Sequence, residues 1–121
     1  MALKTVADYI RYARTLLQDN YEGVDAPYRY SDAELVDALN LGIMEARRVR
    51  PDLLLDYFGY DVPEFSASNL AEEVPVDQMY RSALVYYITG MAQLRDSEDT
   101  PDARATVFLN KFLAQLQVVQ A

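Results

Sequence analysis

The chain has 121 residues, no cysteine and no histidine, and its formal net charge is −8. The two absences exclude disulfides, thiolate nucleophiles, Ser-His-Asp machinery and ordinary zinc sites. The lack of a basic block disfavours sequence-independent DNA binding, which requires clustered lysine and arginine. With 51% hydrophobic residues and no apolar run long enough to cross a bilayer, the sequence predicts one soluble domain, residues 1–121, without a recognisable export signal or membrane segment.

The first helix is expected over residues 6–19. Thr5 is a suitable N-cap, and Asp8 three residues later gives a weaker form of the capping box. Apolar residues follow helical spacing at Val6, Tyr9, Ile10, Ala13, Leu16 and Leu17. Residues 20–30 contain turn residues and three tyrosines, and they are expected to form a loop whose rings either pack on the domain or offer a contact surface.

The best-marked helix of the chain lies between Tyr30 and Leu55. Ser31 is its N-cap, Glu34 is placed to complete a capping box, and Pro51 ends the helix. One apolar stripe consists of Leu35, Leu39, Ile43, Ala46 and Val49, and a second, patchier surface consists of Val36, Leu41 and Met44. Because one stripe is enough to dock a surface helix, the second indicates packing on another side, within the domain or against another subunit.

The same helix has polar and small residues at unusual positions. Gly42 in mid-helix costs roughly 1 kcal/mol relative to alanine, so a close approach of another backbone is expected there. Asn40 is expected to be a buried amide with satisfied hydrogen bonds rather than an active-site group. Arg47, Arg48 and Arg50 form the only basic cluster, which either complements the helix dipole or meets an acidic partner.

Residues 53–76 interrupt the helical pattern and are predicted to form an irregular arm. The run LLLDYFGYDV places aromatic residues around Gly59, which is typical of a short strand and turn or of an extended arm. A segment of this length without helix is often functional. If the domain does not cover them, the apolar side chains of the arm form a patch that requires a partner: Leu54, Leu55, Tyr57, Phe58 and Tyr60.

The third helix is expected to begin after its N-cap, Asp77, and to run to about residue 95. Residues 82–94 contain no charge, and a helix that is apolar nearly all round is buried on most sides. Both a central core helix and a subunit interface that includes Tyr86 and Tyr87 satisfy this pattern.

The fourth helix is expected to open with Thr100 as N-cap and Pro101 in its first turn. Its stripe is Ala105, Phe108, Leu109, Phe112, Leu113 and Leu116. Residues 117–121 form a short C-terminal tail that includes Val118 and Val119. The sequence therefore predicts an all-α fold, a small bundle of about four helices with an extended or short β-like central arm.

Carboxylates offer the one route to catalysis that the composition leaves open. A hydrolase would need two of the carboxylates of the arm, with one of them buried and its pKa raised: Asp56, Asp61, Glu64, Glu72 and Glu73. However, 19 acidic residues supply close pairs by chance, and the sequence has neither a glycine-rich phosphate loop nor an EF-hand pattern. We therefore expect no catalytic, metal or cofactor site, and the apolar surface favours an obligate assembly.

Two runs of the sequence carry a family resemblance. YSDAELVDALNLGIMEARRVRPDLL resembles the second-helix region of the head-to-tail connector (adaptor) proteins of tailed bacteriophages, where W/Y-S/T-D-A/E-E-L-x-x-x-L-N-x-G precedes a run that ends in RPD. VPVDQMYRSALVYYITGMAQLRDSEDTPDARATVFLNKFLAQL is similar to the helix, charged turn and helix that follow in that family. The resemblance covers most of the chain and is weakest over residues 53–73. The chain departs from the family in having no tryptophan.

The resemblance implies a structural virion protein without enzymatic activity. Such a protein forms a ring, commonly of twelve subunits, beneath the portal protein, and joins the portal to neck or tail proteins. It resides in the virion neck after assembly in the host cytoplasm, and DNA passes through its channel without specific binding. The resemblance also implies that residues 116–121 contact the portal. A helical interaction or regulatory module unrelated to the virion is the alternative.

The residues expected at a subunit or portal interface come from the second apolar surface, the basic cluster, the arm, the third helix and the tail. They are Val36, Leu41, Met44, Arg47, Arg48, Arg50, Leu54, Leu55, Tyr57, Phe58, Tyr60, Tyr86, Tyr87, Leu116, Val118 and Val119.

Overall fold

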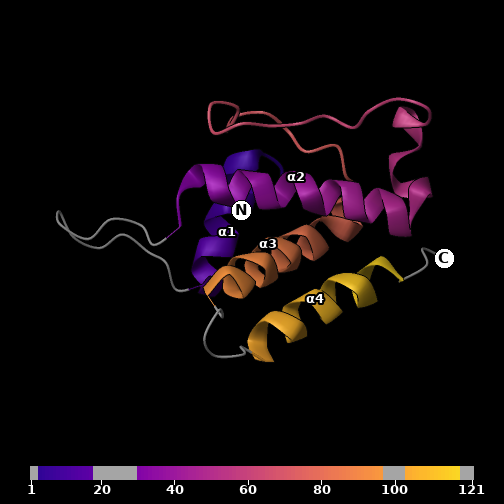
Figure 1. The fold of residues 1–121 in the computed structure, drawn as a ribbon. Coiled ribbons are helices and arrows are strands. Elements are labelled where there is room, and N and C mark those ends of the chain that lie inside the picture. The colour runs from indigo at the N-terminus through magenta and orange to yellow at the C-terminus, as the bar shows by residue number, and fades with distance from the viewer. Residues whose placement is uncertain (1–2, 18–29, 97–102, 118–121) are drawn as a thin grey trace.

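The structure, a computed structural model, describes residues 3–17, 30–96 and 103–117 (Figure 1). In chain order its elements are α1 (Val6–Leu17), α2 (Asp32–Val49), the 3₁₀ helix η1 (Pro51–Tyr57), the 3₁₀ helix η2 (Gln78–Tyr80), α3 (Arg81–Asp96) and α4 (Ala103–Leu116). Over these ranges the fold is helical and contains no β-strand, which confirms the all-α prediction.

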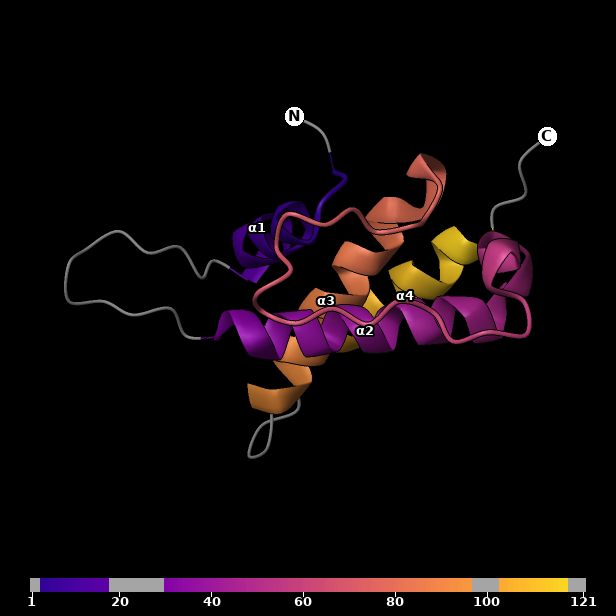
Figure 2. The same ribbon diagram turned by 90° about the horizontal axis from the view of Figure 1, so that it is seen from above.

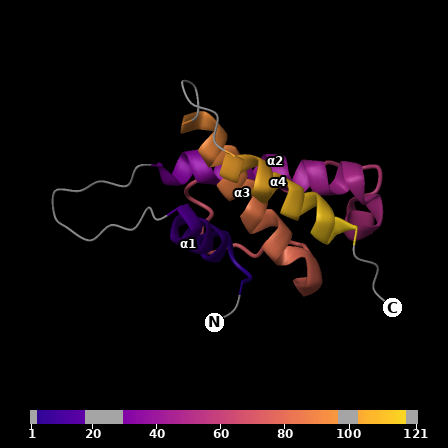
Figure 3. The ribbon, with the colours of Figure 1, turned by 90° about the horizontal axis from the view of Figure 1, so that it is seen from below.

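α3 is the central helix of the bundle. It packs against α1, α2 and α4, and Figure 3 shows it between α1 and α4 with α2 behind. Its buried side chains are Ala83, Leu84, Val85, Tyr87, Ile88, Thr89, Ala92 and Gln93. Of the two roles that the uncharged run left open, the structure therefore supports the core helix.

Two glycines let α3 approach its neighbours closely. A Cβ on Gly42 of α2 would lie 2.9 Å from Cδ1 of Tyr87 and 3.3 Å from Cδ2 of Leu84, so its close neighbours are side chains of α3 and not the backbone that was expected. A Cβ on Gly90 of α3 would lie 2.9 Å from Cγ of Leu109 and 3.2 Å from the backbone oxygen of Ala105. The packing of α3 on α2 therefore depends on the absence of a side chain at Gly42, and its packing on α4 depends on the same absence at Gly90.

The caps at the starts of α1 and α2 follow the sequence, with one exception. The hydroxyl of Thr5 accepts the Asp8 N–H at 3.3 Å and Asp8 Oδ2 accepts the Thr5 N–H at 3.0 Å, so the capping box of α1 is reciprocal. At α2, Ser31 Oγ accepts the Glu34 N–H at 3.1 Å. The Glu34 carboxylate, however, pairs with Arg95 of α3, and this tertiary ion pair replaces the predicted return bond to Ser31.

The arm is irregular, as predicted, but its first part is not a strand. Residues 51–57 form η1, so of the two forms that the sequence left open, a short strand or an extended arm, the strand is not found there. A strand needs a neighbouring strand for its backbone hydrogen bonds, whereas this segment bonds to itself, with Phe58 N–H donating to Leu55 O at 3.0 Å. Gly59, at φ 83°, then reverses the chain, and Figure 2 shows the arm returning along α2.

The far part of the arm covers the start of α1. The Val6 N–H donates to Glu72 O and the Ala7 N–H donates to Leu70 O, both at 2.9 Å. These are N–H groups of the first helical turn, which have no acceptor within their own helix. The buried apolar residues of the arm complete the docking: Leu54, Phe65, Val74 and Val76. The arm is therefore part of the domain rather than a free extension.

Candidate functional site

Three large apolar side chains are exposed where the arm turns. Leu55, Phe58 and Tyr60 are 63%, 77% and 74% exposed, and they flank the positive-φ residue Gly59. We call these three residues the arm tip. Single exposed apolar residues are ordinary, but three within six positions form a patch of the kind that marks interaction sites.

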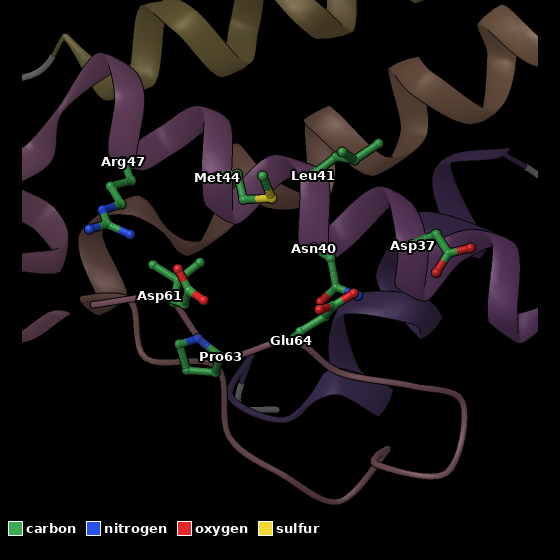
Figure 4. A pocket seen from close by; sticks show the side chains of 9 residues that line it. Asp37, Asn40, Leu41, Met44, Arg47, Asp61, Pro63 and Glu64 are labelled. Carbon is green, nitrogen blue, oxygen red and sulfur yellow. The ribbon is translucent and has the colours of Figure 1, made fainter. Parts of the chain in front are cut away.

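A groove of about 570 Å³ lies between α2 and the returning arm. We call it the α2–arm groove; its lining residues are Asp37, Asn40, Leu41, Met44, Arg47, Asp61, Val62, Pro63 and Glu64. Figure 4 shows the α2 side chains following one another along the helix, with Asp61, Pro63 and Glu64 facing them from the arm. Asp37, Leu41 and Met44 share a face because they are spaced i, i+4 and i+7.

Two sets of hydrogen bonds hold the arm side of this groove in place. Asn40 Nδ2 donates to Phe65 O at 2.8 Å, and the Phe65 N–H donates to Asn40 Oδ1 at 2.9 Å. Near the other end, Arg47 Nη2 donates to Tyr57 O at 3.1 Å. Asn40 is thus the satisfied buried amide that the sequence predicts, and both sets attach the arm backbone to α2.

The groove is acidic at its rim and apolar between its charges. Asp37, Asp61 and Glu64 face it together with one cation, Arg47, while Leu41 and Met44 are 46% and 56% exposed. Such a surface suits a partner that combines apolar and basic side chains.

The basic cluster is engaged within the chain. Arg48 pairs with Glu45 at 2.8 Å, and Arg50 pairs with Asp52 at 2.7 Å. Hydrogen bonds from Arg50 hold the pKa of the Asp52 carboxyl below its usual value. Arg50 also donates to the backbone oxygen of Leu116, near the end of α4. The cluster therefore ties the end of α2 to η1 and α4.

The structure separates the predicted interface residues into four groups. Exposed are Leu41, Met44, Arg48, Leu55, Phe58 and Tyr60, and partly buried are Arg47, Arg50, Tyr57 and Tyr86. Four more are buried in the domain's own core, which leaves little of their side chains for a partner: Val36, Leu54, Tyr87 and Leu116. Val118 and Val119 lie outside the described residues.

Some groove residues were missed by the sequence reasoning. Asp37, Val62 and Pro63 were not proposed for any site, and Asp61 and Glu64 were considered only as catalytic carboxylates. The helical spacing of Asp37 with Leu41 and Met44 was the available signal on α2. For the arm residues there was no such signal, because their approach to α2 is a tertiary contact.

The hydrolase hypothesis required one buried carboxylate in the arm. All five candidates are exposed: Asp56, Asp61, Glu64, Glu72 and Glu73. The condition that the hydrolase hypothesis sets is therefore not met by any of the five. Within the described part of the chain, no three histidine, cysteine, aspartate or glutamate residues are placed to hold a metal ion. In the same ranges, no helix is both long and apolar enough to cross a membrane.

Comparison with known proteins adds no assignment: no protein-family model, curated protein or solved structure matches this chain.

Proposed function

We propose that this chain is a structural head-to-tail adaptor of a tailed bacteriophage, a subunit of a ring of about twelve copies beneath the portal. The ring joins the portal to neck or tail proteins and extends the channel through which DNA passes. Its place is the virion neck, after assembly in the host cytoplasm. The proposal rests on the sequence resemblance of residues 30–54 and 74–116 to that family, and an all-helical fold is compatible with it.

The observation that carries the proposal is an exposed apolar patch on a fixed support. Leu55, Phe58 and Tyr60 of the arm tip are each more than 60% exposed. The segment that bears them is attached to α2 through Arg47 at one side and Asn40 at the other. A patch held in place loses little conformational entropy when a partner covers it, which favours a permanent structural contact.

The charge of the arm is compatible with a neighbour of DNA that does not bind it. Residues 51–77 contain no lysine or arginine and seven carboxylates: Asp52, Asp56, Asp61, Glu64, Glu72, Glu73 and Asp77. A surface of this sign repels phosphates, so DNA can slide past without being held.

The test is assembly with the portal protein encoded in the same genome. The purified chain is mixed with that portal, and the complex is measured by native mass spectrometry and negative-stain electron microscopy. We expect a ring of this chain on one face of the portal. A genome without a portal gene nearby, or a stable monomer that ignores the portal, contradicts the proposal.

A matched pair of variants connects the test to the arm tip. The double variant Phe58→Ser/Tyr60→Ser should remove portal binding or ring formation and keep the helical circular dichroism of the wild type. The control, Val107→Ser/Leu113→Ser, changes two α4 side chains that are 50% and 43% exposed, and it should bind normally. Equal binding by both variants would remove the arm tip from the interface.

The alternative, a helical interaction module unrelated to the virion, predicts the same exposed arm tip with a different partner. Capture of a non-virion protein by the wild type but not by Phe58→Ser/Tyr60→Ser, together with no portal binding, would favour that alternative.

A further inference from the structure

Charge is unevenly distributed between the two sides of the fold. Residues 51–77, which hold most of the arm, are acidic throughout, whereas α4 carries Arg104 and Lys111 and no carboxylate. In Figure 1 the arm lies on one side of α2, and α3 and α4 lie on the other. The molecule therefore has an acidic side formed by α2 and the arm, and a more basic side to which α4 contributes.

A second groove, of about 340 Å³, lies between α1 and α3. We call it the α1–α3 groove. Its lining is mainly apolar and includes Leu16 and the rings of Tyr12 and Tyr86. Each ring carries a cation: the Arg11 guanidinium lies 5.4 Å from the centre of the Tyr12 ring, and Lys111 Nζ lies 5.4 Å from that of Tyr86.

The two grooves are complementary in charge. The α2–arm groove presents Leu41 and Met44 among three carboxylates and one arginine, and the α1–α3 groove presents apolar side chains and aromatic rings beside two cations. Arg11 also pairs with Asp8 at 3.0 Å, which offsets its charge. Lys111 is therefore the main positive charge beside the α1–α3 groove.

We propose that these grooves are the two halves of one contact between copies of this chain. The acidic α2–arm groove of one copy docks on the basic α1–α3 groove of the next. Because the two halves are different surfaces, the contact is heterologous, and repeating it produces a ring or a filament rather than a closed dimer. A contact of the α2–arm groove with itself would bring its three carboxylates toward those of the other copy, which opposes binding. The contact supplies the lateral interface of the proposed ring, and to that extent the inference rests on the proposed function.

The chain has no cysteine, so single introduced cysteines can test the pairing directly. Leu16→Cys labels the α1–α3 groove and Met44→Cys labels the α2–arm groove, at side chains that are 40% and 56% exposed. Under mild oxidation, a mixture of the two variants should form covalent dimers, and each variant alone should form far fewer. The double variant Leu16→Cys/Met44→Cys should form a ladder of oligomers.

The control for cross-linking is Ser68→Cys, an exposed residue of the arm that lines neither groove. Its mixture with Met44→Cys should cross-link no more than chance collisions do. Efficient dimers of Met44→Cys with itself would indicate an isologous contact and overturn the proposal. Absence of dimers in the Leu16→Cys and Met44→Cys mixture, at any protein concentration, would overturn it as well.

Charge reversal tests the electrostatic part of the contact. Lys111→Glu and Asp61→Lys should each weaken self-association, measured by analytical ultracentrifugation, by at least about tenfold. The double variant Lys111→Glu/Asp61→Lys exchanges both signs and should restore association. Asp56→Lys, which reverses an exposed charge outside both grooves, is the control. Equal weakening by Asp56→Lys, or no recovery in the exchanged variant, contradicts the pairing.

These outcomes separate the inference from the proposed function. Portal binding without cross-linking between Leu16→Cys and Met44→Cys would refute this contact and leave the adaptor proposal standing. Cross-linking without portal binding would support the contact and refute the adaptor proposal.

Discussion

Asn40 of α2 and Phe65 of the arm exchange two hydrogen bonds, at 2.8 and 2.9 Å, across a separation of 25 residues. The Asn40 side chain donates to the Phe65 carbonyl and accepts from the Phe65 N–H. One amide thus replaces the neighbouring strand that an extended segment would otherwise need for its backbone hydrogen bonds. This pair explains how the arm keeps a defined position along α2 and shapes the α2–arm groove, while a β-bridge between Glu73 and Thr5 holds its far part.

Asn40→Ala should destabilise the domain by roughly 2–6 kcal/mol, because it leaves two buried backbone groups of Phe65 unpaired at about 1–3 kcal/mol each. Urea unfolding followed by circular dichroism measures the change. Asn69→Ala is the control: Asn69 accepts the Ser66 N–H at 2.9 Å in an exposed turn of the same arm, and its loss should cost less than about 1 kcal/mol. Equal losses in the two variants would show that Asn40 does not fix the arm.

The same residue shows what the sequence can and cannot predict. Its polar side chain among apolar neighbours indicated a buried, satisfied amide, and that prediction is confirmed. Its hydrogen-bond partner could not be predicted, because no local pattern in the sequence relates position 40 to position 65. Caps and breaks were predicted well where they are local: Ser31, the Thr5–Asp8 capping box and Pro51 act within a few residues.

The exposure of the candidate interface residues was predicted less well, because it too depends on tertiary contacts. Val36 and Met44 belong to the same predicted apolar surface of α2, yet Val36 is fully buried and Met44 is 56% exposed. Helical spacing tells which residues share a face, but it does not tell how far another element extends over that face. Leu54 and Leu55 are adjacent in the arm and differ in the same way, at 2% and 63% exposed.

Alanine at the two close-approach glycines should destabilise the domain despite the helix propensity gained. Gly42→Ala would push against the Tyr87 ring, which packs on Phe112 with ring centres 4.9 Å apart. We expect the free energy of unfolding to fall by about 1 kcal/mol, because the overpacking exceeds the helix-propensity gain of about 1 kcal/mol. Gly90→Ala should cost more, since it meets a backbone oxygen of α4, which cannot move without the helix.

Thermal and urea unfolding of the two glycine variants are compared with those of Asn110→Ala, an exposed α4 position where alanine should be neutral or slightly stabilising. A stabilised Gly90→Ala would mean that α3 and α4 are farther apart than the structure has them.

Tyr9→Phe should leave the stability unchanged or raise it by up to about 1 kcal/mol. Tyr9 is fully buried, and its hydroxyl has no hydrogen-bond partner within the described part of the chain. Burial also raises the pKa of that hydroxyl. Removing a buried, unpaired polar group removes its desolvation cost.

Tyr80→Phe is the matched comparison for Tyr9→Phe, because Tyr80 is also buried but its hydroxyl bonds to Arg50. The Tyr80→Phe variant should lose about 1 kcal/mol of its free energy of unfolding. If Tyr9→Phe is the more damaging of the two in urea unfolding, the Tyr9 hydroxyl has a partner that this arrangement does not provide.

Asp8 should make the domain less stable in acid. Hydrogen bonds from the backbone N–H groups of Thr5 and Lys4 lower the pKa of its carboxyl to about 2 from 3.8. Because the folded-state pKa is depressed, the unfolded chain binds the proton more readily. The contribution of Asp8 to stability is therefore complete above pH 4 and is lost as the pH falls toward 2. Asp8→Asn should destabilise the protein at pH 6, and its difference from the wild type should shrink between pH 4 and pH 2 in urea unfolding.

Arg11→Gln distinguishes the two sources of this pH dependence. Arg11 pairs with Asp8 at 3.0 Å, but the backbone hydrogen bonds are the larger cause of the lowered pKa. Arg11→Gln should therefore retain most of the acid sensitivity that Asp8→Asn removes. Retention is expected because an exposed pair of this kind contributes only about 0.3–0.5 kcal/mol on a helix. If Arg11→Gln instead abolishes the acid sensitivity, the ion pair dominates and the capping box contributes little.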